Sequence, residues 1–374
     1  MTTCVLLANI YYPQTILSSM ASDLGLRSET SGSIITAGQI GYAIGILLIV
    51  PLADKIRNRQ LICLLTISVS VCLAICSQSS GKNMFMTVAC LTGVFSSVVQ
   101  VAVPFAASLT EPEHRGRVLG LVLGGLVSGI VLSRTTASFA DQYIGWRGLY
   151  LTAAAVTLIL AVLQYRTLPE KVPAGNGESL TRILLSLPRI FLKTEGLKTW
   201  LAIASLPMTA AALFWSVVPM QLADCVLLTK SEIAVVSLCG AVSIPTVIGV
   251  GVLLDKGYGA TLARLLTVVT AGAFLALAYF SDRLVSYCFA IALCDTVLIV
   301  VTAVVQRSVF LLNALQTARL NAVNVASNFA GSAAGSFVGP WIYQHWGFAT
   351  VVGVGCALLS IDFVFCLRMT DVRG

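Results

Sequence analysis

The chain consists largely of apolar runs roughly twenty residues long, separated by short stretches that carry charges, glycine or proline. A run of that length crosses the hydrocarbon core of a bilayer as a helix, which satisfies its own backbone polar groups. A membrane β-barrel would instead show segments of about ten residues with alternating polarity. Apolar residues make up 57% of the chain and charged residues only 10%, whereas soluble chains carry about a quarter charged residues. The sequence therefore predicts an all-α integral membrane protein.

Twelve membrane-spanning helices are predicted from these runs. The first run is not preceded by a basic segment or followed by a small-residue cleavage site, so we expect a span there rather than a cleaved signal peptide. The twelve runs lie near 4–22, 32–53, 60–78, 84–108, 117–140, 147–166, 199–222, 232–254, 261–280, 285–306, 319–343 and 348–367.

The basic residues orient these spans. With both termini in the cytoplasm, 17 of the 23 basic residues fall in cytoplasmic connections, 5 in outer loops and one, Arg134, inside a span. This asymmetry is what the positive-inside rule requires. The net charge of +7 is therefore attributed to membrane topology, and no nucleic-acid partner is expected.

The one long connection, 167–198, begins with proline and glycine and continues as an amphipathic segment. We expect a short helix there, bent at Pro188 and lying on the inner leaflet.

Landmarks recur between the two halves of the chain at a nearly constant offset. Leu52-Ala53-Asp54-Lys55 matches Leu253-Leu254-Asp255-Lys256 at offset 201, Arg117 and Gly129 match Arg319 and Gly331 at offset 202, and Trp146 matches Trp346 at offset 200. This repeat predicts two six-helix bundles, 1–166 and 199–374, joined by the linker 167–198. Two parallel repeats that rock about a shared cleft are typical of secondary transporters.

Three stretches resemble the major facilitator superfamily, and in particular its bacterial proton-coupled drug or sugar efflux members. They are Ala8-Asn9-Ile10-Tyr11-Tyr12-Pro13-Gln14, Pro51-Leu52-Ala53-Asp54-Lys55-Ile56-Arg57-Asn58-Arg59, and Glu113-His114-Arg115-Gly116-Arg117-Val118-Leu119-Gly120 with the glycines that follow. The chain departs from the family pattern in three places. The loop signature has Pro51 and Arg57 in place of glycines, and the fourth span lacks the arginine of many antiporters. In the fifth span Ser133-Arg134-Thr135 replaces a Gly-Pro pair.

The resemblance implies a carrier in a bacterial inner (plasma) membrane that exports a small organic molecule against proton entry. A symporter for uptake and a non-transporting membrane receptor or lipid-modifying enzyme are the alternatives. No nucleotide fingerprint or catalytic triad occurs, and the only histidines, His114 and His345, lie in predicted loops. We therefore expect no enzyme activity, metal or other cofactor, and a monomer whose partners are its substrate, protons and lipid.

Asp54, Lys55 and Arg59 lie in the connection between the second and third spans. In the family arrangement this aspartate meets the start of the eleventh span near Arg319, where a helix N-terminus stabilises a carboxylate. The resemblance thus implies a gate on the cytoplasmic side. The alternative is that these charges only keep the loop on the cytoplasmic side of the membrane.

Asp295 lies about halfway along its span, about 15 Å from either membrane face. An unpaired carboxylate at that depth is expensive, so it must face water, find a partner or carry a proton. A proton-coupling site needs this balance, but a structural hydrogen bond to a neighbouring helix is equally compatible with it.

Arg134 cannot shed its proton and must pair or bind an anion. Asp141, seven residues on, lies two turns away on roughly the same helical face. A structural partnership with a carboxylate or with helix carbonyls is favoured slightly over substrate contact.

The first, fourth, seventh and tenth spans line the cavity in the family fold, and the eleventh could contribute. The residues implied are mostly amides and aromatics, which suit an amphipathic substrate. They are Asn9, Tyr12, Gln14, Gln100, Trp215, Gln221, Gln306, Asn324 and Asn328. Glycines at G-x-x-x-G spacing in the fifth and eleventh spans predict close helix contacts.

Overall fold

The computed structural model describes residues 2–111, 114–170, 180–312 and 317–369, and the regular structure in those ranges is entirely helical. Three short elements are 3₁₀-helices: η1 (Ser28–Thr30), η2 (Val50–Asp54) and η4 (Leu238–Val242). The α-helices are α1 (Thr2–Tyr11), α2 (Pro13–Asp23), α3 (Ser33–Ile49), α4 (Asn58–Ser77), α5 (Lys82–Ser96), α6 (Val99–Ser108), α7 (Arg115–Tyr143), α8 (Gly145–Thr167), α9 (Leu180–Lys193), α10 (Leu197–Trp215), α11 (Val218–Asp224), α12 (Lys230–Ser237), α13 (Ser243–Asp255), α14 (Gly259–Tyr279), α15 (Leu284–Leu312) and α16 (Thr317–Cys366).

Ten helical segments of the described chain are long and apolar enough to cross a membrane. One of them, α16, is 50 residues long and contains a single non-helical residue, Gly347, with φ of 76°. The runs predicted at 319–343 and 348–367 are the two parts of α16 on either side of this glycine. The run predicted at 4–22 corresponds to α1, a shorter apolar helix, followed directly by α2.

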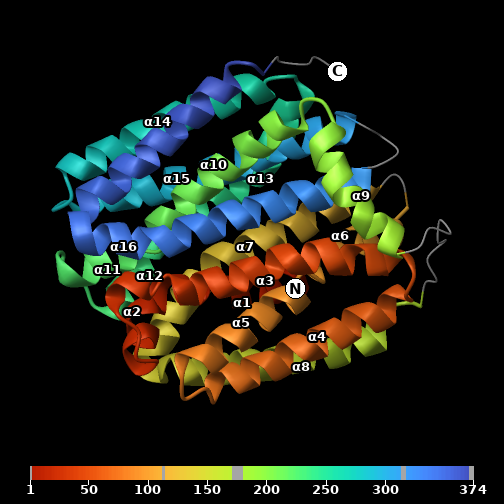
Figure 1. The fold of residues 1–374 in the computed structure, drawn as a ribbon, viewed down its shortest axis with the longest axis horizontal. Coiled ribbons are helices and arrows are strands. Elements are labelled where there is room, and N and C mark those ends of the chain that lie inside the picture. The colour runs from red at the N-terminus through yellow and green to blue at the C-terminus, as the bar shows by residue number, and fades with distance from the viewer. Residues whose placement is uncertain (1, 112–113, 171–179, 313–316, 370–374) are drawn as a thin grey trace.

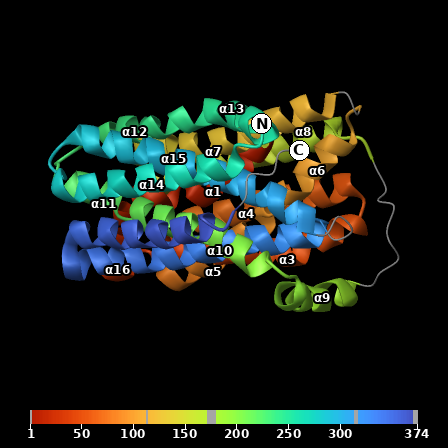
Figure 2. The same cartoon turned by 90° about the horizontal axis from the view of Figure 1, so that it is seen from above.

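The long helices lie side by side along the long axis of the molecule (Figure 1). Residues up to 167 fill the lower part of that view and residues from 197 the upper part, with α7 near the middle. Figure 2 shows α9 outside the bundle at one end. Large apolar side chains such as Leu64, Leu121 and Phe289 are exposed on the long helices, as expected where lipid replaces water.

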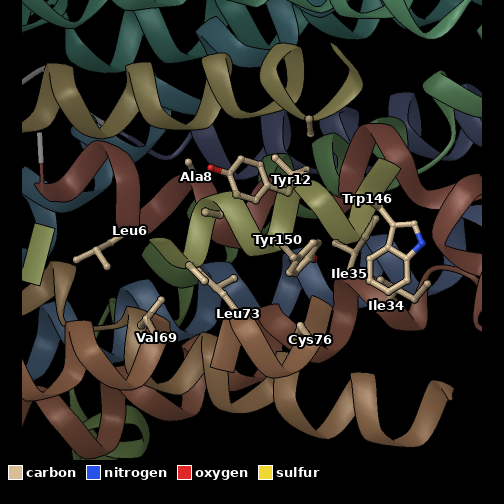
Figure 3. Close-up of a cluster of buried hydrophobic side chains, with 14 of the residues drawn as sticks. Leu6, Ala8, Tyr12, Ile34, Ile35, Val69, Leu73, Cys76, Trp146 and Tyr150 are labelled. Carbon is tan, nitrogen blue, oxygen red and sulfur yellow. The ribbon is translucent and has the colours of Figure 1, made fainter. Parts of the chain in front are cut away.

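The buried cores follow the same division of the chain. One cluster draws almost all its side chains from residues 6–168, and Figure 3 shows part of it around Tyr12, Tyr150 and Trp146. Two others come almost wholly from residues 184–369. A smaller cluster crosses between them, where the rings of Tyr42 and Phe329 lie 4.2 Å apart.

Glycine permits close helix contacts at the predicted places in α16. A Cβ on Gly335 would collide with the backbone of Thr209 in α10, and Gly339 and Gly331 also pack on α10. In α7 the prediction holds for Gly129, which packs on the backbone of Cys4, whereas Gly124 has open space beside it.

The segment in which the sequence predicts an amphipathic linker helix contains the helix α9. Its apolar side chains Leu187 and Ile190 are buried against the C-terminal helices, together with Leu197 and Leu201. Leu185 and Leu192 on the other side are exposed. The face of α9 that contains Leu187 and Ile190 therefore packs on protein. Contact of the opposite face of α9 with the membrane leaflet stays a prediction.

Candidate functional site

Two helix breaks place the side chains of the candidate site. α1 ends at Tyr11 and α2 begins at Pro13, because proline has no N–H for the helix ladder and is favoured in a first turn. Likewise α10 ends at Trp215, and α11 begins just before Pro219. Gln14 lies just after the first break and Trp215 just before the second, and both side chains contact Arg134.

Arg134 of α7 is the centre of this region and is only 1% exposed. Its Nη1 donates to Asp295 Oδ2 at 2.6 Å, and its Nε donates to Gln14 Oε1 at 2.9 Å. Its guanidinium lies 3.7 Å from the centre of a Trp215 ring, a stacking that arginine makes well. The hydroxyl of Thr15 donates to the backbone carbonyl of Arg134 at 3.0 Å. These contacts fix the guanidinium in one position.

Asp295 of α15 is 5% exposed and uses both carboxylate oxygens. Oδ2 accepts from Arg134, and Oδ1 accepts from the indole N–H of Trp215 at 3.1 Å. Gly240 in η4 closes the other side, since a Cβ there would collide with Oδ2. At about 1.5 Å per residue, Asp295 lies about 16 Å from the first residue of α15 and about 26 Å from its last. The helix continues beyond the end of the predicted run at residue 306, and the depth of Asp295 within the membrane stays a prediction.

The ion pair joins the two parts of the chain. Arg134 and Gln14 belong to N-terminal helices, and Asp295 and Trp215 belong to C-terminal helices. A buried ion pair gains little net stability because desolvation opposes the attraction, but removing one partner costs about 3–5 kcal/mol. Removing either side chain would therefore leave the other charge buried without its partner at this contact between the two parts.

A second ion pair connects the two parts nearer the end that the charge count places outside. Lys230 Nζ lies 2.6 Å from Asp141 Oδ2, and the hydroxyl of Ser19 donates to the same oxygen at 2.6 Å. Ser138 donates to the Lys230 carbonyl at 2.7 Å. A further hydrogen bond joins Ser231 to Gln142. We call Asp141 and Lys230 the terminal latch.

Asp141→Asn is expected to weaken this latch. Losing the charge of a buried hydrogen-bonded carboxylate costs about 1–3 kcal/mol, which changes the open-to-closed ratio about 5- to 150-fold. The distance between spin labels at the exposed positions Tyr143 and Leu227 should therefore shift toward longer values. Glu170→Gln, which removes an exposed pair with Arg57 between the residue before α4 and the segment after α8, serves as the control. An unchanged distance in the first variant would show that the latch does not hold this end closed.

The remaining predicted cavity residues lie outside the contacts of the ion pair. Asn9 faces Thr157 of α8 at 3.5 Å, and Tyr12 packs edge-on against Tyr150 within the N-terminal core (Figure 3). Each of the other predicted amides either forms a hydrogen bond to a residue away from the ion pair or has no hydrogen-bond partner for its side-chain oxygen. Gln100 donates to the Tyr42 hydroxyl, Gln221 accepts from Tyr343, Gln306 donates to Asn321, and Oδ1 of both Asn324 and Asn328 has no partner.

The predicted gate is described only in part. The side chain of Asp54 lies outside the described residues, and Lys55 is exposed. Arg59 donates to the backbone carbonyl of Tyr165 in α8, and its guanidinium lies over the ring of the same tyrosine. Arg319 donates to Ser186 in α9. A gating role for these residues stays a prediction.

Two further acidic residues form contacts that sequence reasoning did not identify. Asp141 was weighed as a partner of Arg134, but it pairs with Lys230, the first residue of α12. Asp362 is fully buried in α16, where Thr267 donates to it at 3.2 Å. The signal for Asp362 was present, since it is a lone carboxylate within an apolar run just as Asp295 is.

A family model described as the Major Facilitator Superfamily matches residues 1–317. The chain belongs to this superfamily. An uncharacterized transporter of Escherichia coli O157:H7, YgaY, is 28% identical over 370 residues, which are 98% of this chain and 93% of that protein. The purine ribonucleoside efflux pump NepI of Escherichia coli O6:K15:H31 is 22% identical over 177 residues, which are 46% of this chain and 45% of that protein.

The solved structures of similar fold include a D-xylose-proton symporter. It has a TM-score of 0.72 and 14% identity, and the match covers 99% of this chain and 96% of that one. At this identity the likeness establishes the fold alone. The chain is thus a multi-pass membrane transporter of the superfamily, as its resemblance implies.

Proposed function

We propose that this chain moves a small organic molecule across a bacterial inner membrane by alternating access, as proton-coupled efflux. In this proposal twelve spans form two six-helix bundles, 1–166 and 199–374, with both termini in the cytoplasm and 167–198 as the linker. The protein works as a monomer. The superfamily membership and the limited similarity to the efflux pump NepI support the class of activity.

The observation that carries the proposal is the buried ion pair between Arg134 and Asp295 across the two parts of the chain. When Asp295 is ionised, the pair and the Trp215 hydrogen bond hold the parts together at this point. When a proton neutralises Asp295, the charge attraction is lost, and Arg134 can leave. Proton binding therefore favours separation of the two bundles, and deprotonation favours their closure. A proton can in this way alternate the access of the cleft.

Transport in proteoliposomes tests the proposal. Purified protein is reconstituted, and movement of radiolabelled inosine, D-xylose and fluorescent cationic dyes is followed with and without an imposed pH gradient. We expect at least one solute to move opposite to the proton gradient. Movement in the same direction as the protons would instead show a symporter, and transport unaffected by the gradient would contradict proton coupling.

A further inference from the structure

The face of α9 that points away from the protein combines exposed leucines with exposed basic residues. Leu185 is 78% exposed and Leu192 is 65% exposed, and Arg189 and Lys193 on the same helix are also exposed. Positions three and four apart share one face of a helix, so these four side chains form a single stripe. We call Leu185, Arg189, Leu192 and Lys193 the outer stripe. Leucine side chains are stabilised by leaving water, which favours a partner that covers them.

Contacts on the opposite face hold α9 in one orientation. Leu187 and Ile190 are buried in a core of the C-terminal part, and Ser186 accepts a hydrogen bond at 3.4 Å from Arg319 near the start of α16. The helix also contacts η2 of the N-terminal part. Because this inner face is occupied, the outer stripe cannot turn inward. α9 itself lies outside the bundle, so the outer stripe is a preformed surface (Figure 2).

The charges of this segment favour an anionic partner. Residues 180–198 contain four basic residues and one acidic residue, Glu195. Within the described part of the chain, no acidic side chain forms an ion pair with Arg189 or Lys193. A basic residue near an anionic membrane surface strengthens binding about fivefold. Apolar side chains on the same face of such a helix enter the boundary between headgroups and acyl chains.

A membrane leaflet fits the outer stripe better than a second copy of this chain does. In a two-fold contact between copies the stripe would meet itself, and the basic residues of one copy would oppose those of the other. The helix also contacts η2 and α16, at the end of the bundle that the charge count places in the cytoplasm. Acidic headgroups of the inner leaflet supply countercharges, and the acyl chains beside them cover the two leucines.

We propose that the outer stripe is a binding site for an anionic phospholipid of the inner leaflet. Arg189 and Lys193 contact the phosphate, and Leu185 and Leu192 lie along the acyl chains. A guanidinium can donate to two phosphate oxygens at once, whereas lysine acts as a point charge. A zwitterionic lipid carries its own cation beside the phosphate and therefore binds more weakly. Selection between headgroups distinguishes this site from simple contact of α9 with the leaflet.

Native mass spectrometry of the purified protein in detergent, titrated with lipid, tests the site. The probes are phosphatidylglycerol, which is anionic, phosphatidylcholine, which is zwitterionic, and glycerol 3-phosphate, which has a phosphate but no acyl chains. We expect phosphatidylglycerol to bind about tenfold or more tightly than either other probe. Arg189→Gln with Lys193→Gln should weaken its binding about tenfold or more, and Leu185→Ser with Leu192→Ser should weaken it too. The midpoint of thermal unfolding should stay unchanged in both variants, since all four side chains are exposed.

Lys256→Gln with Arg368→Gln is the matched control. Both residues are exposed, and the charge count places both on the cytoplasmic side, but they follow α13 and α16 and lie outside α9. The protein loses the same net charge, and its affinity for phosphatidylglycerol should be unchanged. An equal loss in this control, an unchanged affinity in the variant at Arg189 and Lys193, or equal binding of the three probes would each overturn the proposal. Transport is not measured, so the result is independent of the proposed function.

Discussion

Replacing Asp295 by asparagine is expected to abolish substrate accumulation driven by a pH gradient. Each pH unit is worth about 1.4 kcal/mol per proton, so two units support at most about a 100-fold accumulation ratio with one proton per substrate. The asparagine accepts hydrogen bonds but cannot bind a proton. The ratio measured in proteoliposomes should therefore fall to about 1. Exchange of labelled for unlabelled substrate, which needs no net proton movement, should continue and would show that the variant is folded.

Asp362→Asn provides the matched control for this experiment. Asp362 is also buried in an apolar helix, but it bonds to Thr267 within the C-terminal helices. It does not join the two parts of the chain through any contact described for it. Accumulation should persist in this variant. If Asp295→Asn kept its response to the gradient, the aspartate would be a structural partner of Arg134 and nothing more.

Replacing Arg134 by leucine is expected to reduce the free energy of unfolding by about 3–5 kcal/mol, because it leaves Asp295 buried without a cation. The double replacement Arg134→Leu with Asp295→Leu should recover most of this loss, since both charges are then removed. Unfolding by denaturant in detergent micelles is measured for the unaltered protein, Arg134→Leu, Asp295→Leu and the double variant, and the four values together give the interaction energy between the two side chains.

Arg147→Ala is the control for the effect of losing an arginine. Arg147 pairs with Asp23, and both side chains are about half exposed, so its loss should cost no more than about 1 kcal/mol. Additive losses in the double variant at Arg134 and Asp295 would contradict the pairing seen in the structure. Transport should be lost in both Arg134 variants irrespective of stability.

The sequence predicted the helices well because their signal is local. A run of apolar residues between charges identifies a membrane helix without knowledge of its neighbours. The described chain has ten helical segments long and apolar enough to cross a membrane, the last of which holds two predicted runs on either side of Gly347, and the first predicted run corresponds to the shorter helices α1 and α2. The family resemblance also implied the fold correctly. Exact helix ends differ, as for α15, which extends to Leu312.

The pairing in the site could be predicted only in part. The sequence left open whether Asp295 faces water, finds a partner or carries a proton, and whether Arg134 pairs or binds an anion. The two residues are 161 positions apart, and nothing in the spacing shows that α7 meets α15. Asp141 was the carboxylate nearest in sequence, and its true partner again comes from the other part of the chain. Which side chains of the first span approach the ion pair also depends on how α1 and α2 pack against α7. Gln14 does so, whereas Asn9 and Tyr12 contact the N-terminal core.

The central claim is that the charge of Asp295 controls whether the two parts of the chain stay together. The most direct test is the distance between spin labels at Tyr143 and Leu227 as a function of pH, in the chain with Asp295 and in Asp295→Asn. The labels are attached through non-canonical amino acids, because the chain has 11 cysteines of its own. His345 is replaced by glutamine in both proteins, since its Nε2 lies 3.9 Å from Glu29 Oε2 and this contact also joins the two parts of the chain.

With Asp295 present, we predict that lowering the pH shifts the label distance toward longer values, because protonation removes the attraction to Arg134. In Asp295→Asn the distance should already be long and should not change with pH. A shift of the same size and midpoint in both proteins would contradict the claim.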